Sequence, residues 1–299
     1  MSVNRKIGVA SLIGAVLAWA TAPVFVHYFS KAFDQTTQNF FRYFSSTCLL
    51  WIVSLVFFRD HLKKAMRSVR KFIFPVAMNI IFQGFWVWGL TYIQPAFGTL
   101  VAKSGVLFAA LFAYIFYRDE RASIRSAKYI GGTLLALGGI AGLILSGRVD
   151  SRVYLKGVLL LTAGALFWSI YGIAVKRVLR DINPIASFTM ISTYTTAVFL
   201  ILMFAFGRPG DFLASSWRVK LLLTGSGVLC IATAHTFYYI GIKNLGVAIS
   251  ASFTLSQPLI TAVISYIVFS EMLNLFQILS GLLIIAGSFL VIRASNRTD

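Results

Sequence analysis

Apolar and polar positions alternate in long blocks along this chain of 299 residues. A helix that crosses a bilayer needs about 20 mainly apolar residues, whereas a strand of a membrane β-barrel shows a shorter, alternating pattern. The continuous runs seen here predict an all-α membrane protein with ten transmembrane helices. The expected helices cover residues 7–29, 39–58, 72–92, 96–117, 129–146, 157–175, 185–206, 221–242, 246–269 and 273–292.

Composition and charge agree with a membrane protein. Hydrophobic residues make up 58% of the chain and the mean hydropathy is +0.82, which is too apolar for a soluble domain of this size. The net charge of +18 could suggest nucleic-acid binding. With both termini in the cytoplasm, however, 18 of the 27 Lys and Arg residues lie inside, seven lie outside, and only Arg42 and Lys103 fall within spans. This positive-inside asymmetry predicts a multi-pass protein of the inner (cytoplasmic) membrane and no nucleic-acid partner.

The two halves of the chain resemble each other. An offset of 149 residues aligns GAVLAWA (14–20) with AGALFWS (163–169), and an offset of 152 aligns FAYIFYRDE (112–120) with ISYIVFSEM (264–272). The first match also argues against removal of the first span, which imitates a secretory signal. Because five spans per unit is an odd number, the second unit should enter the membrane inverted. We expect two inverted five-helix repeats, residues 1–147 and 148–299.

These motifs resemble the EamA-type group of the drug/metabolite transporter superfamily. Each half closes with a span that ends in an acidic residue, Asp119 or Glu271, followed by a Gly-rich helix. The segment TLSQPLITAVISYIVFSEMLNLFQILSGLLIIAG (254–287) is similar to the repeat signature of that family, and FFRYFSS (40–46) to the start of its second span. The first half departs from the pattern, with Val106 at the position of Pro258 and Lys103 at the position of Leu255.

Lys103 is a full positive charge inside an apolar span. A charge at such a depth costs about 3 kcal/mol on insertion scales, and a lysine there reaches the headgroups only with difficulty. None of the nine acidic residues falls well inside a span to pair with it. We therefore predict that Lys103 lines a wet cavity and serves as the counter-ion of a substrate, with snorkelling as the alternative.

Several polar and aromatic residues share this depth. Asn79, Gln83 and Trp86 lie on one helical face, and the repeat maps Gln83 onto His235 and Trp86 onto Tyr238. Such residues either line a site at the repeat interface or bond to neighbouring helices. The candidate substrate-binding residues are Lys103, Asn79, Gln83, Trp86, Trp19, Trp168, Tyr171, His235, Tyr238, Tyr239, Ser256 and Gln257. Pro258, in the middle of an expected span, either loosens a gate or makes a harmless kink.

Other residues in the spans have structural interpretations. Arg42 lies one turn inside its span, so snorkelling to the outer surface is its default explanation. Gly138 and Gly142 form a GxxxG face that predicts close helix packing. Cys48 and Cys230 both lie inside spans, and we interpret them as small buried residues without a disulfide.

Together these features predict a secondary transporter that works by alternating access. The family resemblance implies a small metabolite, often an amino acid, with export common, and Lys103 with its aromatic neighbours favours an anionic or zwitterionic cargo. No phosphate-binding loop, metal cluster or nucleophile–base pair is found, so we expect neither an enzyme nor a cofactor. A passive channel and a lipid-modifying membrane enzyme are the alternatives. Coupling to protons, through Lys103 or His235, or to substrate exchange stays open.

Overall fold

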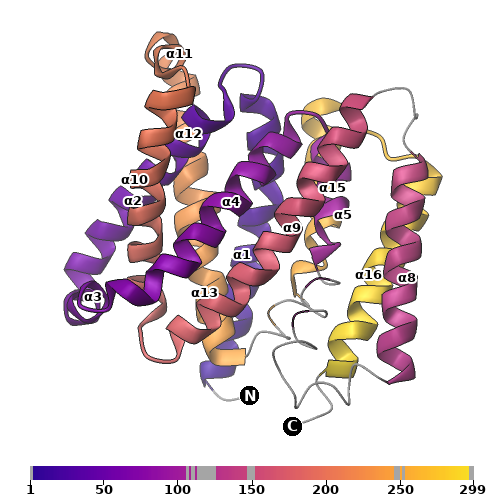
Figure 1. Cartoon of the computed structure of the whole chain (residues 1–299), viewed down its shortest axis with the longest axis horizontal. Coiled ribbons are helices and arrows are strands. Elements are labelled where there is room, and N and C mark those ends of the chain that lie inside the picture. The colour runs from indigo at the N-terminus through magenta and orange to yellow at the C-terminus, as the bar shows by residue number, and fades with distance from the viewer. Residues whose placement is uncertain are drawn as a thin grey trace.

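The computed structural model of the protein describes residues 3–105, 108, 112, 126–146, 152–245, 250 and 253–295, which form helices and no strands. The elements are α1 (Val3–Phe29), α2 (Gln35–Phe57), α3 (Arg59–Met66), η1 (Val69–Phe72), α4 (Ile73–Leu90), α5 (Pro95–Ala102), α8 (Ala127–Ser146), α9 (Arg152–Leu179), α10 (Pro184–Phe206), α11 (Pro209–Ala214), α12 (Trp217–Gly227), η3 (Val228–Thr233), α13 (Ala234–Leu245), α15 (Gln257–Phe269) and α16 (Leu275–Ser295). α1 begins and α16 ends at the same end of this bundle (Figure 1).

The described residues include six helical stretches that are long and apolar enough to cross a membrane. These stretches are Arg5–Phe29, Gln35–Phe57, Val69–Leu90, Val153–Leu179, Pro184–Phe206 and Trp217–Leu245. Their outward faces carry exposed apolar side chains such as Ile52 and Phe204, which only a lipid environment would favour. The chain is thus a helical multi-pass membrane protein. α8 and α16 match two more of the expected spans, and α5 and α15 match parts of the remaining two.

Two of the expected spans are not continuous helices. α5 ends at Ala102 and is followed by a turn at residues 103–104, and most of the rest of the expected span 96–117 lies outside the described residues. In the second half, residues 253–254 are helical, residues 255–256 form a turn, and α15 begins at Gln257. Pro258 therefore lies in the first turn of a helix, where proline is tolerated, and not in a helix interior. The repeat aligns the two turns with each other.

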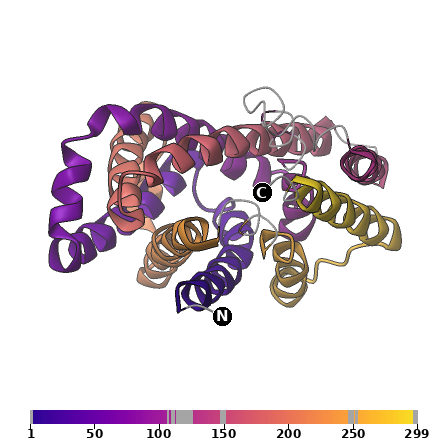
Figure 2. The same cartoon turned by 90° about the horizontal axis from the view of Figure 1, so that it is seen from below.

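The helices pack in pairs that join the two halves of the chain. α1 packs on α13, α4 on α9, α2 on α10, α5 on α15, and α8 on α16. Along α2, Thr47 bonds Thr196 whereas Ser54 bonds Thr189, so α2 and α10 run antiparallel. The magenta α8 and the yellow α16 form the pair at the edge of the bundle (Figures 1 and 2). If each helix is replaced by its counterpart in the other half, so that α1 becomes α9 and α13 becomes α4, the same five pairs result.

Two expectations about small residues need correction. A side-chain atom added at Gly139 would lie 2.6 Å from the Ser280 carbonyl oxygen, and one at Gly142 would lie 2.4 Å from the Ser280 hydroxyl, whereas Gly138 has open space. The close face of α8 is therefore Gly139/Gly142, because an i, i+3 pair faces the partner helix here. Cys230 is buried, whereas Cys48, which was expected to be buried as well, is exposed on the surface of the bundle.

Hydrogen bonds at the end opposite the start of α1 connect the two halves. The Asp34 carboxylate caps α2 and also accepts the backbone N–H of Arg208 at 2.8 Å, which ties the α1–α2 connection to the connection after α10. Partial burial disfavours ionisation of Asp34, but the bonds from Thr36, Thr37 and Arg208 outweigh it and hold the pKa of the carboxyl below its usual value.

Glu271 supplies the missing cap of α5. The N-cap residue of α5, Gln94, makes no side-chain capping bond. Instead the Glu271 carboxylate, which follows α15, accepts the N–H groups of Ala96 at 3.0 Å and Phe97 at 3.1 Å. A negative charge at a helix N-terminus is favourable because it meets unpaired N–H groups and the positive end of the helix dipole. The acidic residue of the repeat signature thus joins the two halves in this structure.

Loss of this cap is expected to destabilise the protein. Glu271→Ala should lower the free energy of unfolding by about 1–2 kcal/mol, the usual cost of losing an N-cap, and thermal unfolding of the purified protein in detergent measures it. Asp211→Ala is the matched control, since the side-chain interaction of Asp211 within the described residues is an exposed ion pair with Arg208 and such pairs contribute little. Equal midpoints for the two variants would contradict the capping role.

Candidate functional site

A cavity of about 100 Å³ lies inside the bundle, between elements of both halves. A single bound water needs only about 10–15 Å³, so the cavity has room for a small organic molecule or several waters. Its lining residues are Trp19, Ala22, Arg42, Phe82, Gln83, Trp86, Ala102, Lys103, Ala165, Trp168, Cys230, Ile231, His235, Thr254 and Gln257. Seven of the predicted residues are in this set: Lys103, Gln83, Trp86, Trp19, Trp168, His235 and Gln257.

Lys103 reaches the cavity from the break at the end of α5. Its Nζ donates a hydrogen bond to Oε1 of Gln257 at 3.1 Å. The amide of Gln257 in turn donates to the Trp19 carbonyl oxygen at 3.1 Å. Lys103 therefore has one neutral partner, which the sequence did not indicate, and it forms no ion pair within the described part of the chain.

Aromatic rings form a large part of the cavity wall. The ring centroids of Trp19 and Trp168 are 5.6 Å apart, those of Trp19 and His235 are 5.0 Å apart, and those of Phe82 and Trp168 are 4.9 Å apart. Tryptophan rings offer large apolar surfaces to a ligand, and the indole N–H needs a partner when it is buried. The Trp19 indole satisfies this need by donating to the Cys230 carbonyl oxygen at 3.1 Å.

The Cys230 carbonyl belongs to a π-helical turn. The expected span 221–242 is helical throughout. Between α12 and α13, η3 contributes six residues in π-helical conformation. Such turns are rare and often occur at functional sites, because they leave backbone groups free to bind side chains or ligands. Here Cys230 and Ile231 line the cavity, and the Ile231 carbonyl lies 3.1 Å from Nδ1 of His235.

Arg42 is a second cation on the cavity wall, and its expected snorkelling is wrong. Its residue surface is only 2% exposed, because α2 turns this face into the bundle. Nε donates to the Ser226 hydroxyl at 3.2 Å, and Nη1 has no hydrogen-bond partner within the described residues. Position along the span gave no sign of this, but its place in FFRYFSS, beside large aromatic residues, could have raised the question.

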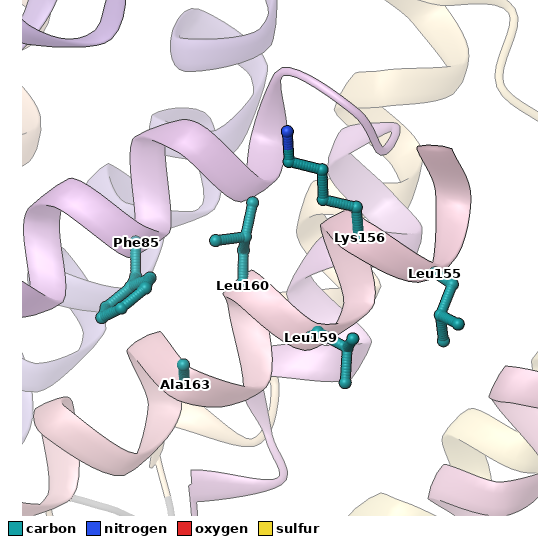
Figure 3. A pocket seen from close by; sticks show the side chains of 6 residues that line it. All are labelled: Phe85, Leu155, Lys156, Leu159, Leu160 and Ala163. Atoms are coloured by element: carbon teal, nitrogen blue, oxygen red, sulfur yellow. The ribbon is translucent and has the colours of Figure 1, made fainter. Parts of the chain in front are cut away.

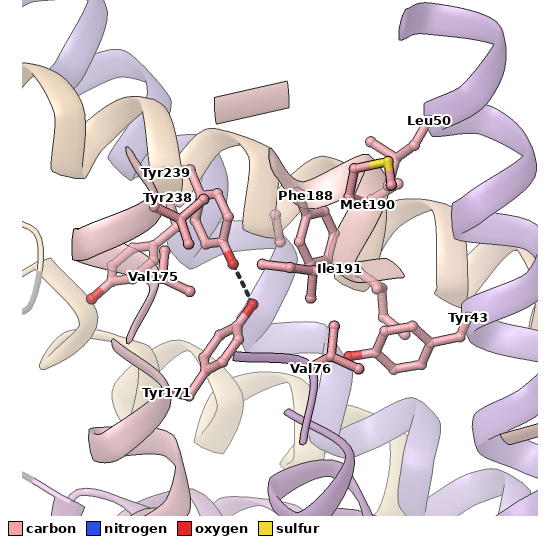
Figure 4. Close-up of a cluster of buried hydrophobic side chains, with 14 of the residues drawn as sticks. Tyr43, Leu50, Val76, Tyr171, Val175, Phe188, Met190, Ile191, Tyr238 and Tyr239 are labelled. Atoms are coloured by element: carbon pink, nitrogen blue, oxygen red, sulfur yellow. Dashed lines mark hydrogen bonds between the residues drawn. The ribbon is translucent and has the colours of Figure 1, made fainter. Parts of the chain in front are cut away.

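The remaining predicted residues lie off the cavity wall. The fully buried Asn79 bonds the Tyr43 hydroxyl at 2.9 Å and the Thr195 hydroxyl at 3.1 Å, which fits the alternative of bonding between helices. Tyr171 and Tyr239 share a hydrogen bond inside the hydrophobic core, with Tyr238 next to them (Figure 4). Ser256 and Pro258 flank Gln257 at the start of α15 but are not among the lining residues.

A second hollow lies between α4 and α9 and has a different chemistry. It is lined by Phe85, Leu155, Lys156, Leu159, Leu160 and Ala163, which Figure 3 shows along one side of the two helices. Apart from Lys156 its lining is apolar, and Leu155 and Leu159 are exposed on the outer face of α9. Only one of its described lining residues is polar, whereas a metabolite site usually combines several convergent polar groups.

Comparison with known families gives a match over both halves of the chain. The sequence profile of the EamA-like transporter family matches residues 6–145 and again residues 155–293. The cavity is lined from both matched segments, with Lys103 and Arg42 in the first and His235 and Gln257 in the second.

Several proteins resemble the whole chain. An uncharacterized transporter of Haemophilus influenzae is 26% identical over 91% of this chain and 92% of its own length. The uncharacterized transporter YyaM of Bacillus subtilis is 24% identical over 82% of this chain and 80% of its own. A WAT1-related protein of Arabidopsis thaliana is 28% identical over 71% of this chain and 62% of its own. A crystal structure with 18% sequence identity has the same fold, with a TM-score of 0.67 over 98% of both chains.

Proposed function

The chain belongs to the EamA-like transporter family, and from this premise we propose that it is a secondary transporter that moves a small anionic or zwitterionic, amino-acid-like organic metabolite across the membrane, with export as the expected direction. The observation that carries the proposal is the cavity between the two family-matched segments, where Lys103 faces aromatic rings. In this proposal Lys103 holds the carboxylate of the cargo. Gln83 and His235 supply hydrogen bonds, and the tryptophans enclose its apolar part.

We propose that transport proceeds by alternating access of two inverted repeats, residues 1–147 and 148–299. The antiparallel packing of α2 on its repeat counterpart α10 supports this, because a helix and its equivalent run the same way in repeats of the same orientation. The helix breaks at residues 103–104 and 255–256 support it as well. Discontinuous helices at equivalent positions mark the substrate site in many transporters with this kind of repeat.

The membrane orientation belongs to the same proposal. The end of the bundle where α1 begins is assigned to the cytoplasm of a cell with an inner membrane, because most basic residues outside the spans belong to that side. Lys71 and Asp181, which form an ion pair between η1 and the α9–α10 connection, lie on this side. Both termini are then cytoplasmic.

Counterflow in liposomes tests the transporter proposal. Purified protein is reconstituted into liposomes loaded with a mixture of unlabelled amino acids and small organic acids, and uptake of labelled members of the mixture is measured. A transporter should give saturable uptake that the internal substrate stimulates, because a loaded carrier returns faster than it reorients empty. Uptake that rises linearly with the external concentration and does not depend on the internal substrate would contradict the transporter proposal and indicate a passive channel.

A further inference from the structure

The cavity holds two cations, and the cargo proposed above needs only one. Lys103 extends from the end of α5, and Arg42 extends from α2. Trp19 bonds to neighbours of both cations. Its carbonyl oxygen accepts a hydrogen bond from the amide of Gln257, the partner of Lys103. Its indole N–H donates to the backbone carbonyl of Cys230. The Cys230 thiol lies beside the Arg42 guanidinium. The two cations therefore line one cavity and have different partners on its wall.

Neither cation is neutralised by the protein as far as the structure describes it. The ion pairs in that part of the chain are Lys63–Asp60, Lys71–Asp181 and Arg208–Asp211, all at exposed positions away from the cavity. Among the described residues, the cavity lining contains no carboxylate. A buried charge without a partner is strongly unfavourable in an apolar interior, so proteins keep one only where something else compensates it.

Arg42 has the geometry of an unfilled binding group. The guanidinium is a planar fork that binds a carboxylate through two parallel hydrogen bonds. On this side chain Nε bonds Ser226, which fixes the orientation, while the buried Nη1 has no partner among the described residues. Ser226 is held in turn because its hydroxyl donates to the Leu223 carbonyl at 2.7 Å. The arginine is positioned, buried and left with donors to spare.

We infer that Arg42 and Lys103 form two anion-binding positions in one cavity, and that the cargo is a small organic acid with two anionic groups joined by an apolar middle. This inference rests on the proposed transport function and narrows its cargo. A dianion would neutralise both cations, while the rings of Trp19 and Trp168 would enclose the apolar middle. A zwitterion would neutralise one cation and bring a third positive charge into a cavity whose described walls carry no carboxylate.

Three probes that share a phenyl ring test this inference: phenylsuccinate with two carboxylates, 3-phenylpropionate with one, and zwitterionic phenylalanine. Their binding to the purified full-length protein is measured by calorimetry and by thermal shift. Because hydrogen bonds between charged groups are among the strongest in proteins, we expect phenylsuccinate to bind at least about tenfold more tightly than either other probe. Arg42→Gln should remove this advantage and leave 3-phenylpropionate binding within about twofold of wild type.

Two further measurements separate binding from folding. If Arg42 is a binding group, ligand-free Arg42→Gln should unfold at the same temperature as wild type or higher, because a buried unpaired charge has been removed. Arg42→Lys keeps the charge but loses the fork, and should recover only part of the preference for phenylsuccinate. A large drop in the unfolding temperature of ligand-free Arg42→Gln, with the preference for phenylsuccinate intact in Arg42→Lys, would overturn the inference in favour of a structural arginine.

The outcomes also distinguish the inference from the proposed function. Binding of phenylalanine or 3-phenylpropionate as tight as that of phenylsuccinate overturns the dianion inference and leaves the transporter standing. Binding of none of the three to wild-type protein, together with no counterflow in liposomes, overturns both.

Discussion

Replacement of Lys103 with methionine is expected to reduce transport to background while the protein stays folded in the membrane. Methionine has a similar length and no charge, so the cavity keeps its shape but loses a cation. A hydrogen bond to a charged group contributes about 1.5–3 kcal/mol, so the affinity for an anionic cargo should fall by about 10- to 100-fold. Counterflow with reconstituted protein measures transport, and the thermal unfolding curve checks folding.

Lys156→Met is the matched control for this experiment. Lys156 lies outside the central cavity, with its Nζ 5.0 Å from the Trp88 ring centroid and 4.7 Å from that of Tyr92. Loss of this charge should leave the rate of transport nearly unchanged. Wild-type transport by Lys103→Met would remove Lys103 from the binding site, and equal loss in both variants would point to a general effect of charge.

Gly227→Ala is expected to prevent normal folding or to lower the stability severely. A Cβ atom at Gly227 would lie 2.1 Å from the Arg42 carbonyl oxygen and 2.8 Å from its carbonyl carbon, both backbone atoms of α2 that no rotamer change can move. Inserting one carbon into a packed interior usually costs about 1–3 kcal/mol, and a clash with backbone should exceed this range. The yield of monodisperse protein and its thermal midpoint measure the effect.

Gly225→Ala provides the opposite expectation in the same helix. A Cβ atom at Gly225 has no neighbour within 4 Å, and alanine favours a helix over glycine by about 1 kcal/mol. This variant should be as stable as wild type or slightly more stable. Similar losses in the two variants would show that helix flexibility, and not the contact between α12 and α2, requires the glycines.

The helical, multi-pass membrane fold could be predicted from the sequence, because it follows from hydrophobicity along the chain. Lys103, Trp19 and His235 were recognised because polar or aromatic residues at mid-span need a physical reason, and all three border the cavity. Their roles in substrate binding stay predictions. The family match fits the internal repeat that the offsets of 149 and 152 indicated.

The direction in which each residue faces could not be obtained in the same way. Arg42 was assigned by its distance from the end of its span, whereas its burial depends on how α2 packs against α12. Asn79 shares a helical face with Gln83, yet its side chain bonds the hydroxyls of Tyr43 and Thr195 and does not line the cavity. Periodicity gives the face of a helix but not the neighbour that covers it. The rotation of each helix about its own axis determines whether a residue such as Asn79 faces the cavity or another helix.

Lys103 and Leu255 occupy equivalent helix breaks but differ in charge. This difference affects which conformation the substrate-free protein prefers. In a perfectly duplicated chain, swapping the roles of the two units would turn an inward-open form into an outward-open form of identical free energy, so both would be equally populated. Under the proposed alternating access, a lysine in only one of the two units makes the two forms differ in free energy, because the exchange of roles would put a leucine in its place. The state preferred by the empty protein would then be set by positions at which the two units differ, as Lys103 and Leu255 do.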